Sequence, residues 1–172
     1  MDALTLLKQQ LKDAHGLLDA TMQGVTPQHA HWLPGGKANP ISASYAHVVL
    51  SEDFVVNGML KGAPPLCATN WAGKVGLSEM PPPGPMANWF DWGRKVKVDL
   101  AAMKKYSEAV YANTESYLAT LKDADLSRKI ATPAGEQTVA WVLSNVLVGH
   151  IHDFTGEISC MKGMQGMKGY PF

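Results

Sequence analysis

The sequence has very little cysteine, and this limits the chemistry it can carry. Its 172 residues include only two cysteines, Cys67 and Cys160, which are far apart and form no Cys-x-x-Cys spacing. With so little cysteine, we expect a reduced, cytoplasmic setting. No basic group is obviously placed to activate Cys160, so we do not expect it to act as a nucleophile.

The sequence also lacks an excess of either charge, because Lys+Arg and Asp+Glu each number 15. A chain without net charge has no general electrostatic attraction for nucleic acid, anionic membranes or acidic substrates. There is no basic start followed by an apolar stretch, and no uninterrupted apolar run of membrane length. We therefore expect neither nucleic acid nor membrane as a partner.

What is present is the composition of an ordinary globular protein. Hydrophobic residues make up 46% of the chain and charged residues 17%, which excludes a disordered protein. A chain of this length is long enough to bury a proper core. We expect a single domain that spans residues 1–172.

Two predicted helices carry a histidine among apolar residues. In Val139–Lys162 the apolar residues recur at helical spacing on one broad stripe, and His150 lies inside that stripe. Ile41–Leu60 repeats the arrangement with His47. An unpaired buried imidazole is costly, so each histidine needs a partner, and a metal ion is one candidate.

The same periodicity predicts two more helices, Ala3–Met22 and a helix that starts near Trp89 or Arg94 and continues to about Leu121. Between the second and third helices lies a stretch rich in proline and glycine, Ala63–Asn88, which is either a lid or partner surface, or a simple packed crossover. Four long helices without convincing strand alternation predict an all-α fold. The expected architecture is a four-helix bundle with a long crossover connection between helices 2 and 3.

Two smaller features lie outside these helices. The connector Asp123–Glu136 is expected to contain one short extended piece, Lys129–Thr132. His29 and His31 lie two residues apart on a short polar turn, and we expect both at the surface.

Several segments resemble the DinB-like (YfiT-like) metalloenzyme superfamily. Residues 39–54, NPISASYAHVVLSEDF, look like its second helix with a single inward histidine. Residues 150–172, HIHDFTGEISCMKGMQGMKGYPF, resemble its last helix and tail, where two histidines separated by three residues precede a Gly-Glu or Gly-Gln pair. Together with the turn ending in HWLPGGK, the resemblance spans most of the chain.

The resemblance implies a four-helix bundle, often a homodimer, in which three side chains bind a divalent metal such as nickel or zinc. It also implies that some members are metal-dependent thiol transferases or isomerases. By position, His47 and His150 match two of the metal ligands. The third ligand position holds Phe154, which cannot bind a metal.

A neighbouring side chain could replace the missing ligand. Asp153 and Glu157 share a helix face with His150, so either could complete a set of two histidines and one carboxylate. His152 is about 200° around the helix from His150 and should point elsewhere. His15 of the first helix is a further candidate.

These observations leave three functions open. The first is a hydrolase or transferase, more specifically a metal-dependent thiol transferase or isomerase, with an incomplete two-histidine site. The second is a non-catalytic bundle that has lost its metal and binds an apolar small molecule beside Phe154. The third is a structural dimer module. The carboxylate of Glu157 on the inward helix face favours a polar centre of the bundle over an apolar one.

Overall fold

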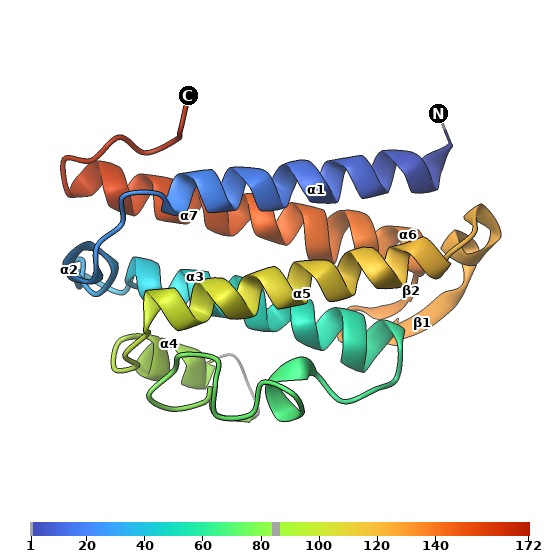
Figure 1. The fold of residues 1–172 in the computed structure, drawn as a ribbon, viewed down its shortest axis with the longest axis horizontal. Coiled ribbons are helices and arrows are strands. Elements are labelled where there is room, and N and C mark those ends of the chain that lie inside the picture. The colour runs from blue at the N-terminus through green and yellow to red at the C-terminus, as the bar shows by residue number, and fades with distance from the viewer. Residues whose placement is uncertain (1, 84–86) are drawn as a thin grey trace.

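The computed structural model describes residues 2–83 and 87–172, which fold into a bundle of four long helices (Figure 1). In chain order the elements are α1 (Ala3–Met22), α2 (Pro27–Ala30), α3 (Ile41–Asp53), η1 (Phe54–Leu60), η2 (Leu66–Ala68), α4 (Ala87–Gly93), α5 (Leu100–Thr120), η3 (Asp123–Ser127), β1 (Lys129–Thr132), β2 (Gly135–Thr138), α6 (Val139–Trp141), η4 (Val142–Gly149) and α7 (His150–Met164). α7 packs against α1 and α3, and α3 also packs against α5. α1 and α7 run in one direction, and α3 and α5 run in the other (Figure 1).

The predicted all-α bundle with a long crossover is confirmed. α3 and α5 can run in the same direction because the crossover returns the chain along the length of the bundle (Figure 1). The first helix has the predicted bounds, and its leucines Leu4, Leu7, Leu11 and Leu18 are buried. Within residues 2–83 and 87–172, no helix combines the length and the apolar character that crossing a membrane requires.

The predicted start of the third helix is wrong. The segment around Trp89 forms a separate short helix, α4, and α5 begins only at Leu100. The Asp99 carboxylate caps α5 by accepting hydrogen bonds from the backbone N–H groups of Ala101 and Ala102. The crossover packs closely against the start of α5 at Gly76. A Cβ at this position would lie 2.8 Å from the carbonyl oxygen of Asp99, so only glycine fits. The apolar spacing continued across this break, so periodicity alone did not reveal it.

The connector after α5 contains more structure than expected. The extended piece Lys129–Thr132 is confirmed as β1, but it pairs in an antiparallel hairpin with a second strand, β2. The strand Gly135–Thr138 has a polar sequence, GEQT, without the alternation that would predict a strand. Pro133 and Ala134 form the tip of the hairpin.

His31 is not the surface residue that its polar turn suggested. Its Nε2 atom lies 3.0 Å from the backbone N–H of Val98, and its Nδ1 atom lies 2.9 Å from the carbonyl oxygen of Pro27. A carbonyl can only accept, so Nδ1 donates and Nε2 accepts. The half-buried imidazole therefore joins α2 to the chain just before α5.

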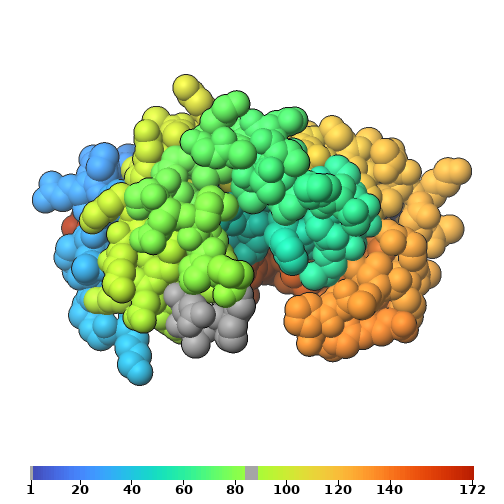
Figure 2. Space-filling view, turned by 90° about the horizontal axis from the view of Figure 1, so that it is seen from below, coloured from blue at the N-terminus to red at the C-terminus, as the bar shows by residue number. Residues whose placement is uncertain are grey.

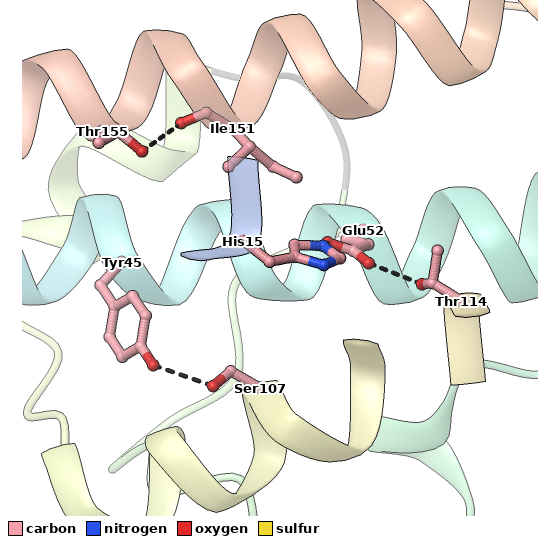
Figure 3. Close-up of polar contacts among 7 residues, drawn as sticks. All are labelled: His15, Tyr45, Glu52, Ser107, Thr114, Ile151 and Thr155. Carbon is pink, nitrogen blue, oxygen red and sulfur yellow. Dashed lines mark hydrogen bonds and ion pairs between the residues drawn. The ribbon is translucent and has the colours of Figure 1, made fainter. Parts of the chain in front are cut away.

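A polar cluster lies inside the bundle between α1, α3 and α5 (Figure 3). Nε2 of His15 lies 2.8 Å from Oε2 of Glu52, and both residues are buried. The hydroxyl of Thr114 donates to Oε1 of the same carboxyl over 2.6 Å. The ring of Tyr111 stacks on His15 with a centroid distance of 3.7 Å. Each oxygen of the buried Glu52 carboxyl therefore has a partner, as burial of such a group requires.

We predict that Thr114→Val destabilises the fold by about 1–3 kcal/mol, because Glu52 then loses a buried hydrogen-bond donor without a change in side-chain shape. Thr120→Val on the same helix is the matched control, since that hydroxyl is exposed and should change stability by no more than about 0.5 kcal/mol. Urea unfolding monitored by circular dichroism measures both values. Equal stability of the two variants would contradict a stabilising role for this hydrogen bond.

Candidate functional site

A cavity of about 540 Å³ opens on the side of the bundle that carries the crossover and the hairpin. Figure 2 shows the hollow between the green crossover and the orange hairpin, with teal and red atoms of the bundle helices visible inside it. The volume is in the usual range for small-molecule sites. The lining residues are His47, Leu50, Ser51, Phe54, Val55, Met59, Pro65, Cys67, Met80, Pro81, Trp89, Thr132, Pro133, Ala134, Trp141, Val146 and His150.

The two histidines predicted from the helical stripes meet in the wall of this cavity. The Nε2 atom of His47 on α3 lies 3.2 Å from the Nε2 atom of His150 on α7. A neutral imidazole carries a single N–H, so at this distance one Nε2 donates and the other accepts. The hydroxyl oxygen of Ser51 lies 3.5 Å from Nε2 of His47 and is a weaker third member of the group.

Both imidazoles favour the neutral form. Burial, and to a lesser extent the charge that His150 can carry, together lower the pKa of His47 to about 4. Burial also lowers the pKa of His150, against the opposing effect of the Asp153 carboxylate. At neutral pH the pair therefore presents hydrogen-bonding nitrogens without a positive charge.

Aromatic rings surround the histidine pair. The ring of Phe154 lies 4.7 Å from each of the two imidazole centroids. Trp89 of α4 meets His47 edge to face at 4.6 Å. These contacts explain the burial that lowers the pKa values, since the position of the expected third ligand is filled by an apolar ring.

Both histidine-bearing helices contain π-helical turns where they line the cavity. The segment η1 follows directly after α3, and η4 leads directly into α7. A π-helical turn shifts the side-chain positions relative to the 3.6-residue period, and such turns are frequent at functional sites. Val146 of η4, predicted on the core stripe, is half-buried and lines the cavity instead.

The other candidate ligands lie elsewhere. His15 pairs with Glu52, whereas His152 and Asp153 are exposed and line neither this cavity nor the smaller one beside it. Glu157 does reach the site from its outer side. Its carboxylate accepts a hydrogen bond from the buried hydroxyl of Ser44 over 3.3 Å, and it lines a smaller cavity of about 180 Å³ together with His47.

No sequence pattern indicated the group that holds the cavity wall, the fully buried Asp53. One carboxylate oxygen accepts from the backbone N–H of Leu66 over 2.8 Å, and the other accepts from that of Cys67 over 2.9 Å. The side chains of Asn57 and Tyr106 also donate to this carboxylate. Pro65 and Cys67 of the crossover are thereby fixed against the cavity. Burial and the Asp53 charge raise the pKa of the Cys67 thiol, so this thiol stays protonated.

The donor set fits a metal only in part. Two histidine nitrogens bound to one tetrahedral zinc would be about 3.3 Å apart, close to the observed 3.2 Å. A catalytic zinc site needs three protein ligands, however, and among residues 2–83 and 87–172 no group of three potential ligand side chains comes together. The described residues therefore do not form a complete site for the divalent metal that the resemblance implies.

The fold and the site together define an all-α bundle protein with paired histidines in the wall of an apolar cavity. The family model of the DinB superfamily matches residues 10–153, and the chain belongs to this superfamily. A crystal structure described as a conserved protein from Enterococcus faecalis has the same fold, with a TM-score of 0.78, 20% sequence identity, and coverage of 94% of this chain and 96% of that one. No curated protein matches the chain.

We predict that the nuclear magnetic resonance signals of His47 titrate with a midpoint near pH 4. In the unfolded chain a histidine titrates near pH 6.5, so between these values the unfolded state binds more protons than the folded state. The stability that neutral His47 contributes is therefore complete above pH 6.5 and is lost as the pH falls towards 4. Urea unfolding of His47→Gln should show a weaker loss of stability over this window than the unsubstituted protein. A midpoint for His47 near 6.5 would contradict the burial argument.

Proposed function

We propose that this protein binds a small molecule with a large apolar body and a polar group that reaches the histidine pair. The observation that carries the proposal is the cavity of about 540 Å³, whose lining is apolar except for a few groups that include His47 and His150. Large apolar pockets with a few convergent polar groups are the usual form of small-molecule sites. Phe54 and Met80 of the lining are 58% and 48% exposed, so the apolar surface continues outwards.

The histidine pair would provide the specificity of such a site. One Nε2–H donates to the other, unprotonated Nε2. A ligand hydroxyl or amine could replace either partner, whereas a ligand carbonyl could replace only the accepting nitrogen. Because both imidazoles favour the neutral form, they neither demand nor repel a charged group. The apolar walls would then supply most of the binding free energy.

We predict that the uncharged dye N-phenyl-1-naphthylamine binds with one site per chain and gains fluorescence as it enters the cavity. Val146→Trp should weaken binding about tenfold or more, because the indole fills space that the dye needs. Asn145→Trp is the matched control, since the neighbouring Asn145 is exposed and does not line the cavity. Fluorescence titration measures all three affinities. Equal affinities for the two variants, or no saturable binding, would overturn the proposal.

Weak binding of a divalent metal by His47 and His150 is the second candidate. The observation that favours it is the Nε2–Nε2 distance, which suits two corners of a tetrahedral site. With two protein ligands such a site would have low affinity. The metal-dependent transferase or isomerase activity that the superfamily resemblance implies would need a further ligand.

We predict that Phe154→His creates a tight zinc or nickel site, because the ring of Phe154 lies 4.7 Å from both imidazoles and a histidine there would add a third ligand. Metal content by mass spectrometry, on protein purified without a histidine tag, should rise from well below one ion per chain to about one. Phe154→Leu is the control that removes the ring without adding a ligand. Stoichiometric metal in the unsubstituted protein, lost in His47→Ala and in His150→Ala, would instead favour the metalloprotein.

A further inference from the structure

The smaller cavity beside the histidine pair has a different chemistry from the larger one. It encloses about 180 Å³ between α3, α4 and α7. Aromatic rings form much of its wall, from Trp89, Phe90 and Phe154. Trp89 and Trp92, both in its lining, pack edge to face at 5.0 Å. The wall therefore offers several aromatic rings within one small volume.

The polar groups of this cavity include two side-chain acceptors, the carboxylate of Glu157 and the side-chain oxygen of Asn39. Glu157 is the one charged side chain in the part of its lining that the structure describes. The buried hydroxyl of Ser44, at 2% exposure, orients that carboxylate by donating to it over 3.3 Å. The side-chain oxygen of Asn39 is buried and has no hydrogen-bond partner among residues 2–83 and 87–172. That oxygen has almost no exposed surface, so the Glu157 carboxylate is the acceptor that a ligand in the cavity could reach.

The two cavities are neighbours, because His47 and Trp89 line both of them. We infer that the smaller cavity binds a protonated amine, held by the Glu157 carboxylate and the aromatic rings. This inference rests on the proposed function, since the apolar body of the same ligand would occupy the larger cavity. The ligand class is thus a cationic amphiphile, an alkyl or aryl chain that carries an ammonium group.

Three ligands with the same ten-carbon chain test this assignment: decylamine, 1-decanol and decanoate. Their affinities are measured at pH 7.5 by displacement of N-phenyl-1-naphthylamine, with concentrations kept below micelle formation. In the unsubstituted protein decylamine should bind about fivefold tighter than decanol, and decanoate should bind more weakly than decanol. In Glu157→Gln the advantage of the amine over the alcohol should disappear, while the affinity for decanol stays the same.

The matched control is Glu115→Gln, which removes the same charge from an exposed position on α5 that lines neither cavity. It should keep the advantage of the amine in full. The amine assignment is overturned if decylamine binds no tighter than decanol, or if its advantage survives in Glu157→Gln. That failure is distinct from failure of the proposed function, in which neither decanol nor the dye would bind at all.

Discussion

The buried carboxylate of Asp53 is the interaction on which the shape of the site depends. A charge without exposure to water is tolerated only when its oxygens are fully hydrogen-bonded, and Asp53 reaches this state with donors from the bundle and from the crossover. Two of those donors are backbone N–H groups of the crossover. If the crossover left the bundle, the Asp53 carboxylate would lose both of these hydrogen bonds. These hydrogen bonds hold the crossover in place as a wall of the cavity.

The helix that carries Asp53 presents a different polar group in each of three directions. Glu52 points into the cluster between α1, α3 and α5 (Figure 3), Asp53 faces the crossover, and His47 faces the cavity. Almost every residue of α3 is buried, which leaves no solvated face. The two carboxyl groups are compensated within their own networks, and the histidine is the one of the three that is free to meet a ligand.

The sequence predicted the features that depend on local periodicity. The bundle and the bounds of α1 follow from apolar stripes on helices, and the resemblance placed His47 and His150 in one site. The structure agrees with each. The break before α5 and the π-helical turns depend on packing between distant segments, so the helical period did not predict them. The hydrogen bonds of Asp53 could not be predicted for the same reason, since its partners lie on other elements. Metal binding and a homodimer stay predictions from the resemblance, and a cytoplasmic location stays a prediction from the low cysteine content.

The division of the cavity wall between helices and connections has a consequence for how binding preference could change. The crossover and the hairpin tip, with Pro133 and Ala134, supply much of the lining, yet the hairpin contributes little to the buried core. Substitutions at the hairpin tip could therefore alter which molecules are accepted while the bundle keeps its stability. The histidine pair, by contrast, lies on the packed helices α3 and α7, so substitutions at the hairpin tip would leave it in place. Related chains could thus share the histidine pair and differ in the shape of the ligand that they bind.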